Sequence, residues 1–242
     1  MNNRTRSIFK DLFEADLRLL ANPICEHCDA RIKNPLLPWI VGNKFIDSPE
    51  RILFVGKPHR GKLGDTLLSG IMDPTDEISD LWNKSWPYWS YTREIVENLY
   101  GINACEYIAF TNVVKCTNVG AGAGKSKSVD LTTKQMAHNC IEDLGVIWKE
   151  IECLKPFTLV FYTYNFFKDM LQRIPFALEG TIKEIKAKNH VVQCRNKKLG
   201  WWERICATPW TSNMRILVVG HPERMGKKEY IELLTNWLRL NP

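Results

Sequence analysis

Short apolar runs alternate with longer amphipathic segments along most of the chain. Four of these runs are rich in Ile, Leu, Val, Phe or Tyr, and they lie at residues 51–55, 107–113, 158–162 and 215–219. This pattern is typical of strands that are buried on both faces. Residues 190–194 add a further candidate strand, in a less regular stretch that includes Trp201, Trp202 and Trp210.

Amphipathic helices are predicted before and between these strands, at residues 7–20, 91–100, 132–154, 165–174 and 227–240. Strands that alternate with helices favour parallel pairing, with helices covering both faces of the sheet. We therefore predict an α/β fold, a three-layer α/β/α sandwich around a mainly parallel sheet. One domain would span residues 1–242, with an N-terminal helix and a cysteine-containing segment, residues 1–50, packed on it.

The composition places the chain among ordinary globular proteins. Its 242 residues are 45% hydrophobic and 25% charged, which is enough to bury a core and excludes a disordered chain. The N-terminal segment is charged and amphipathic, and no apolar run is long enough to span a membrane. We therefore expect a monomeric cytoplasmic protein, without a membrane partner, whose eight cysteines are kept reduced.

The net charge of +6 is modest, but the basic residues gather in segments rich in Gly, Pro or Asn. The main groups lie within residues 57–62, 125–127, 195–198 and 224–228. Positive charge on loops suits a nucleic-acid backbone, which attracts Lys and Arg irrespective of sequence. The charge therefore favours a nucleic-acid partner, and the alternative is a solvated surface that only keeps the protein soluble.

Polar residues stand at the carboxyl ends of the predicted strands, where open α/β sheets bind their ligands. His59 follows the strand at 51–55, Asn112 lies at the end of the second strand, and His221 follows the strand at 215–219. A lone histidine is more often structural than catalytic. Two histidines and an asparagine that converge on one sheet edge favour a binding or catalytic site.

Four cysteines form a second candidate site. Cys25 and Cys28 have a C-x-x-C spacing that allows both thiolates to face one metal, and Cys116 and Cys140 flank the segment after the second strand. Four thiolates suffice for a tetrahedral zinc ion or an iron–sulfur cluster, and the spacing does not choose between them. The alternative is a C-x-x-C turn and two cysteines that fill the core.

These motifs resemble those of the iron–sulfur uracil-DNA glycosylases, a family-4-like branch of the uracil-DNA glycosylase superfamily. Residues 111–116 (TNVVKC) stand letter for letter as in that family, and the resemblance extends from Cys25 to Trp237. It also includes Pro87-Tyr88 at the family's Pro-Phe dipeptide, Lys155-Pro156 before the third strand and Gly220-His221-Pro222 near the end.

The resemblance implies a uracil-DNA glycosylase-like fold and a monofunctional hydrolase that acts in base-excision repair. Such an enzyme flips a uracil or modified pyrimidine out of DNA and hydrolyses its N-glycosidic bond, which leaves an abasic site. Asn112 would hydrogen-bond the edge of the base, Tyr88 would stack on it, and His221 would donate to its O2 as negative charge develops there.

The resemblance assigns further residues around these three. Gly56, Lys57 and Pro58 would complete the base pocket. Contacts to DNA would come from Arg60, Pro222, Arg224 and Met225, with Arg224 or Met225 filling the space left in the base stack. Cys25, Cys28, Cys116 and Cys140 would hold a structural 4Fe–4S cluster, with zinc as the alternative.

The chain departs from the family where the family has GEAPG, because residues 56–60 read GKPHR. Lys57 replaces the family's glutamate and cannot stabilise a cationic sugar. Asp65 or His59 would have to activate water instead, and the alternative for Asp65 is a helix cap or turn. Tyr88 also brings a hydroxyl to a position that is Phe in the family.

Two alternatives to a uracil-excising enzyme follow from these departures. The first is a glycosylase specialised for hypermodified phage cytosine, such as glucosylated hydroxymethylcytosine, in anti-phage defence. The second is a catalytically inactive DNA-binding module that keeps the fold and the iron–sulfur cluster.

Overall fold

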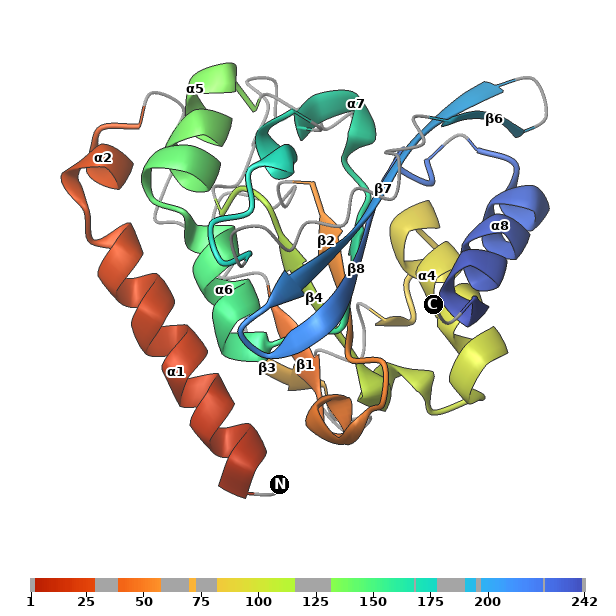
Figure 1. The fold of residues 1–242 in the computed structure, drawn as a ribbon, viewed down its shortest axis with the longest axis horizontal. Coiled ribbons are helices and arrows are strands. Elements are labelled where there is room, and N and C mark those ends of the chain that lie inside the picture. The colour runs from red at the N-terminus through yellow and green to blue at the C-terminus, as the bar shows by residue number, and fades with distance from the viewer. Residues whose placement is uncertain are drawn as a thin grey trace.

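The computed structural model describes residues 3–28, 39–57, 70–72, 82–115, 132–167, 169–177, 190–194, 197–223 and 225–240. Within them, one mixed sheet of eight strands has helices packed on both faces (Figure 1). From one edge to the other the strands are β3 (Gly70–Met72), β1 (Ile40–Gly42), β4 (Ile108–Asn112), β2 (Ile52–Gly56), β5 (Thr158–Phe161), β8 (Thr211–Val219), β7 (Lys197–Thr208) and β6 (His190–Cys194).

Parallel pairing is confined to the centre of the sheet and to its β1–β3 edge. The four central strands, β4, β2, β5 and β8, are all parallel, and β1 is parallel to β3. In contrast, β1 is antiparallel to β4, and β7 is antiparallel to both β8 and β6. The predicted α/β class is therefore confirmed. The prediction of a mainly parallel sheet holds for the four central strands, whereas the sheet as a whole is mixed. A tight turn between Thr208 and Thr211 imposes antiparallel pairing, since a parallel pair needs a long crossover.

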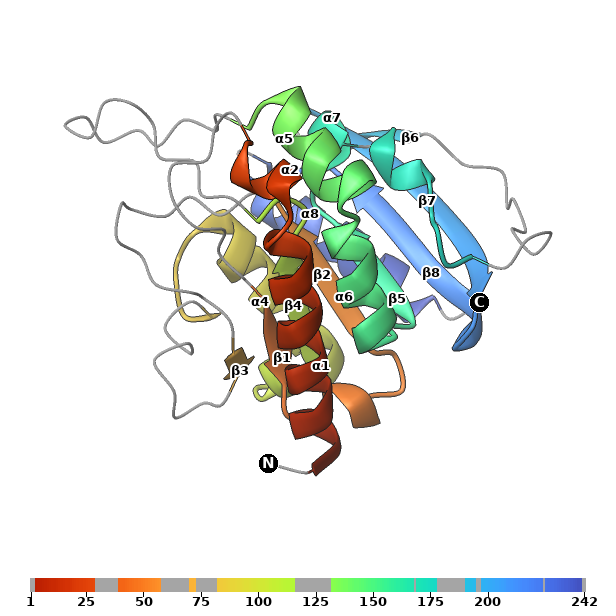
Figure 2. The same ribbon diagram turned by 90° about the vertical axis from the view of Figure 1, so that its left-hand side faces the viewer.

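Helices α1 (Asn3–Leu20), α2 (Pro23–Glu26), α5 (Lys134–His138), α6 (Val146–Leu154) and α7 (Tyr164–Phe167) lie on one face of the sheet. Helices α4 (Pro87–Tyr100) and α8 (Lys227–Arg239) lie on the other face. Figure 2 shows α1 and α6 side by side in front of the strands. Short 3-10 turns lie at Phe45–Asp47, Ala104–Tyr107 and Met170–Gln172.

Two hydrophobic cores sandwich the sheet because successive strand residues point to opposite faces. In β2, Leu53 and Val55 join the core under α1 and α6, while Ile52 and Phe54 join the core under α4 and α8. All five residues of β2 are buried, as expected for a strand covered on both sides. Leu12 of α1 belongs to the first core, so the N-terminal helix packs on the sheet.

The helix predicted at 132–154 is interrupted. It consists of α5, a π-helix at Asn139–Asp143, and α6, which starts after Gly145. The backbone of Gly145 has φ 61°, a left-handed conformation that glycine adopts at little steric cost. The amide of Leu144 donates to the carbonyl of Asn139 at 2.8 Å and closes the wider π turn. The apolar spacing through this segment predicts one continuous helix, because a π turn holds only one residue more than an α turn.

Two other elements differ from the sequence-based prediction. The stretch around Trp201 and Trp202 is the long strand β7, which pairs with neighbours on both sides. The helix predicted at 165–174 is reduced to the single turn of α7 and the 3-10 turn Met170–Gln172. Among the described residues, no helix is long and apolar enough to cross a membrane.

Candidate functional site

The candidate site lies at the carboxyl ends of β2 and β4, where the two strands finish together. Their parallel register pairs Gly56 with Asn112, the last residue of each strand. The amide of Val113 then donates to the carbonyl of Gly56 at 3.1 Å, so the pairing continues one residue beyond β4. Asn112 is therefore held at the sheet edge where ligands of open α/β folds bind.

Gly56 allows two side chains to meet over the strand ends. A Cβ at this position would lie 2.5 Å from Oδ1 of Asn112 and 3.0 Å from Cε2 of Tyr88. Side-chain carbons do not tolerate such distances, because interiors are already packed to van der Waals contact. Glycine is required here by the close approach of the Asn112 amide and the Tyr88 ring.

Tyr88 is supplied by the first turn of α4. The helix starts at Pro87, a residue favoured at this position because it needs no intrahelical amide donor. The ring of Tyr88 meets that of Tyr162 edge-on at a centroid distance of 5.5 Å, and Thr92 Oγ1 donates to the Tyr88 carbonyl at 2.6 Å. Burial raises the pKa of Tyr88 well above its usual value, and Tyr162 raises it further. The Tyr88 hydroxyl is therefore neutral at physiological pH.

His221 faces Tyr88 from the loop after β8. The two rings are nearly parallel, with centroids 6.0 Å apart and planes inclined by 20°. The amide of Glu223 donates to Nδ1 of His221 at 3.1 Å. Because Nδ1 accepts this bond, the neutral imidazole carries its proton on Nε2. His221 therefore presents a hydrogen-bond donor whose tautomer is set by its own loop.

The loop that carries His221 is anchored from α4 and α8. Tyr230 Oη donates to the carbonyl of Gly220 at 2.8 Å, and Tyr91 Oη donates to the carbonyl of Met225 at 3.0 Å. The amide of Met225 donates back to the carbonyl of Pro222 at 3.1 Å. These bonds fix the loop on both sides of His221, so its ring belongs to a rigid part of the molecule.

The structure thus brings Gly56, Tyr88, Asn112 and His221 together at one edge. Lys57 directly follows Gly56 and is half-buried, and Pro222 and Met225 belong to the His221 loop. The other predicted site residues, Pro58, His59, Arg60, Asp65 and Arg224, lie outside the described residues.

Three of the four candidate metal ligands are described. Cys25 lies in α2, Cys28 follows it, and Cys140 lies in the π-helix, and all three are buried in one core without a disulfide. Asn139 of the π-helix donates from Nδ2 to Sγ of Cys28 at 3.4 Å. Cys116 lies outside the described residues.

The chemistry of these cysteines fits a thiolate-bound group in part. Buried sulfurs that accept N–H bonds are common around iron–sulfur clusters, and π-helices are frequent at functional sites. Among the described residues, however, no three His, Cys, Asp or Glu side chains are close enough to hold a metal ion. A metal at this place therefore stays a prediction.

Two residues of the site were not identified from the sequence. Tyr162 and Thr92 lie beneath Tyr88, and Tyr162 Oη is hydrogen-bonded to Thr92 Oγ1 at 3.1 Å, as the donor because the Thr92 proton is used on the Tyr88 carbonyl. Tyr162 has a signal in the sequence, since it is the last residue of the strand predicted at 158–162, at the same sheet edge. Thr92 has none, because its role depends on how α4 packs over the sheet.

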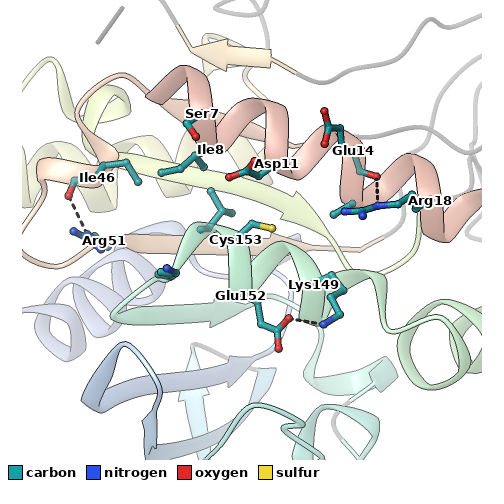
Figure 3. A pocket seen from close by; sticks show the side chains of 13 residues that line it. Ser7, Ile8, Asp11, Glu14, Arg18, Ile46, Arg51, Lys149, Glu152 and Cys153 are labelled. Atoms are coloured by element: carbon teal, nitrogen blue, oxygen red, sulfur yellow. Dashed lines mark hydrogen bonds and ion pairs between the residues drawn. The ribbon is translucent and has the colours of Figure 1, made fainter. Parts of the chain in front are cut away.

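A cavity lies at the opposite end of the sheet. It has a volume of about 550 Å³ and lies between α1 and α6, beside Arg51 at the start of β2 (Figure 3). Lys149 and Glu152 pair with each other at 2.6 Å on its rim. Burial raises the pKa of the Cys153 thiol in its wall to about 11, so this thiol is protonated at neutral pH. The cavity contains none of the predicted site residues.

Comparison with known proteins gives no family for the chain. No family model matches it, and a search of the curated proteins finds no match. The resemblance to iron–sulfur uracil-DNA glycosylases is confined to short motifs, of which residues 111–116 are the most specific. Function therefore has to be inferred from the residues at the sheet edge.

Proposed function

We propose that the protein is a DNA glycosylase that hydrolyses the N-glycosidic bond of a flipped uracil or modified pyrimidine. The observation that supports this most is the convergence of the Asn112 amide, the Tyr88 ring and the His221 imidazole beside Gly56. An amide, an aromatic face and a neutral N–H donor are the groups needed to read, stack and activate a pyrimidine.

Base recognition would use Asn112 and Tyr88. A base inside a duplex is out of reach, and flipping it costs about a few kcal/mol. The Asn112 amide offers a donor and an acceptor, which match O4 and N3–H of uracil. Tyr88 offers a ring for stacking, and its raised pKa keeps the hydroxyl uncharged next to the base. Together they would hold the extruded base and compensate part of the flipping cost.

Catalysis would use His221. As the glycosidic bond breaks, negative charge moves onto O2 of the leaving base, and a donor fixed in advance stabilises it. The Glu223 amide donates to Nδ1 of His221, so the neutral imidazole carries its proton on Nε2, and this N–H is the donor that the role requires. Since Lys57 replaces the family's glutamate, the attacking water would be activated by Asp65 or His59.

DNA would be the partner of this face. Three basic residues would contact phosphates. They are Lys57, which follows Gly56, and Arg60 and Arg224, which lie outside the described residues. Met225, next to the His221 loop, would fill the gap left in the base stack. We expect the protein to act as a cytoplasmic monomer.

Cys25, Cys28, Cys116 and Cys140 would hold a 4Fe–4S cluster, or zinc as the alternative. When bound, the cluster would serve as a structural clip without redox chemistry. Residues of the clip come from α2, from the segment after β4 and from the π-helix, so they would tie three separate parts of the chain together. Asn139 would stabilise the Cys28 thiolate through its N–H donor.

Two other functions have specific support. Tyr88 brings a hydroxyl group to a position that is Phe in the family, which favours a larger, hydroxylated base such as glucosylated hydroxymethylcytosine in phage DNA. Lys57 in place of the family's glutamate favours a DNA-binding module without catalysis. The same experiment separates all three.

The test is base release by purified protein from uracil-containing DNA, single- and double-stranded, and from phage DNA with glucosylated hydroxymethylcytosine. Wild type is compared with His221→Ala and Asn112→Ala, and Asn213→Ala serves as control because Asn213 is exposed on β8. Release that disappears only in the first two variants supports a glycosylase and identifies the base. DNA binding without release from any substrate supports the binding module.

A further inference from the structure

Three charged side chains are completely buried close to Asn112. Lys115, Glu150 and Asp16 are each 0% exposed, although they lie in different parts of the chain. Lys115 follows β4, Glu150 belongs to α6 and Asp16 belongs to α1. Ionisable residues are rarely buried in this way unless they are paired, and a buried pair is weak evidence for stability. The cluster therefore calls for an explanation beyond stability.

Every donor of the Lys115 ammonium is used. Its Nζ donates to Oε2 of Glu150 at 2.7 Å, to Oγ1 of Thr111 at 2.8 Å and to the carbonyl of Asn112 at 2.5 Å. Thr111 Oγ1 in turn donates to the same Glu150 oxygen at 2.7 Å. An ammonium has three donors, so its orientation is completely determined.

The Lys115 contact completes the anchoring of the peptide group that follows Asn112. The Asn112 carbonyl accepts from Lys115, and the Val113 amide donates to the Gly56 carbonyl at 3.1 Å. Both polar groups of this peptide are thus bound, the first from the buried cluster and the second from β2. The backbone that carries the Asn112 side chain cannot rotate without breaking one of them.

Asp16 completes the cluster from α1. Its Oδ2 accepts from Trp39 Nε1 at 3.0 Å. Asp16 Oδ1 and Glu150 Oε1 are both buried without a hydrogen-bond partner among the described residues. Burial first, and then the charge of Glu150, raise the pKa of Asp16 to about 9. At neutral pH Asp16 is therefore a neutral carboxylic acid beside the Lys115–Glu150 ion pair.

We propose that Lys115 is a positioning residue for Asn112, and that Glu150 and Asp16 hold Lys115 in place for this task. The inference rests on the proposed function, in which the Asn112 amide reads the edge of the base. In addition, Lys115, Glu150 and Asp16 hold the Asn112 amide in one orientation without touching the substrate themselves. Misplacing a reacting group by about 1 Å can cost about 100-fold in rate.

The test replaces the pair as a unit, because Lys115→Met alone would leave the Glu150 charge buried and unpaired. A buried ion pair is often replaced by apolar residues without loss of stability, so Lys115→Met with Glu150→Leu is expected to fold. We expect single-turnover base release to fall about 10- to 100-fold, with DNA affinity changed less than about 3-fold.

A double-mutant cycle distinguishes positioning from a general structural effect. In the Asn112→Ala background, the same pair replacement should have almost no further effect on base release, because the side chain being positioned is absent. An equal loss in both backgrounds would overturn the inference.

A second readout does not depend on activity. Hydrogen exchange should show weaker protection of the Val113 amide in the pair variant, because Lys115 anchors the Asn112 carbonyl of the same peptide group. The Tyr162 amide, which donates to the Val55 carbonyl at 2.9 Å at the same edge, is the internal control. Equal loss at both amides, or none at Val113, would contradict positioning even if the wild type releases no base. Absence of base release with the expected exchange pattern would overturn the proposed function alone.

Discussion

The two ends of the central strands differ in what they offer a ligand. At the amino end, a cavity of about 550 Å³ between α1 and α6 is rimmed by charges of both signs on flexible side chains. At the carboxyl end, Asn112, Tyr88 and His221 meet beside Gly56, and hydrogen bonds fix the backbone or loop that carries each of them. Volume alone therefore does not mark the candidate site. The candidate site is identified by polar groups whose orientations are fixed in advance, because only such groups favour one ligand geometry.

The largest effect is expected from removing the groups at the carboxyl end. His221→Ala should reduce base release about 100- to 1,000-fold, the range seen when one donor to a developing negative charge is lost. Arg18→Ala, on the rim of the amino-end cavity, should leave release unchanged. Single-turnover kinetics on the substrate identified above measures both variants. A similar loss of base release in Arg18→Ala would mean that the active site does not lie at the carboxyl end of the central strands.

Gly56→Ala should have the next largest effect. The added Cβ would lie 2.5 Å from Asn112 Oδ1, so the amide has to move, and we expect release to fall about 10- to 100-fold. The matched control is Gly101→Ala, where nothing lies within 4 Å of the added Cβ but φ is 81°. This control should lose about 1 to 3 kcal/mol of folding stability through backbone strain and keep its activity. Urea unfolding and base release together distinguish the two outcomes.

The buried cluster predicts how stability depends on pH. The pKa of Asp16 rises from 3.8 to about 9 on folding, so the folded state holds a proton that the unfolded state has lost between these values. This contribution to stability is complete below about pH 4 and declines as pH rises towards 9. The decline from Asp16 is at most about 1.4 kcal/mol per pH unit.

Urea unfolding at several pH values tests this slope. Asp16→Asn, which mimics the protonated carboxyl, should flatten the decline between pH 5 and 9. Asp11→Asn, on the exposed side of the same helix, should leave the slope as in the wild type. If the free energy of unfolding of the wild type rises steadily over this range, Asp16 is not protonated in the folded state.

The smallest effect is expected from the surface pair at the amino end. Lys149 and Glu152 pair at 2.6 Å with about half of each side chain in solvent, 55% and 39%. Removing such a pair changes stability by less than about 1 kcal/mol because water and salt screen it. Lys149→Ala should therefore match the wild type in urea unfolding and in base release. A large loss of release would give the amino-end cavity a role in activity.

Several features could be predicted from local pattern. The central strands are short apolar runs, and β2 and β4 differ from their predicted bounds by a single residue at each end. Asn112 was placed correctly at a strand end, because the carboxyl ends of parallel strands share one edge. The meeting of Tyr88 with His221 was expected only from the resemblance of short motifs, since no spacing connects two residues so far apart.

The sequence by itself determined the α/β class, the strand that ends at Asn112 and the histidine that follows β8, because apolar periodicity and turn residues act over a few positions. Tertiary structure decided that Gly56 must lack a side chain, that the 132–154 helix breaks at Gly145, and that Asp16, Glu150 and Lys115 form one buried cluster. Each of these depends on which distant segments pack together. Burial then changes the chemistry, since a carboxyl and an ammonium that would be ordinary surface groups in water become a fixed, neutral support for Asn112.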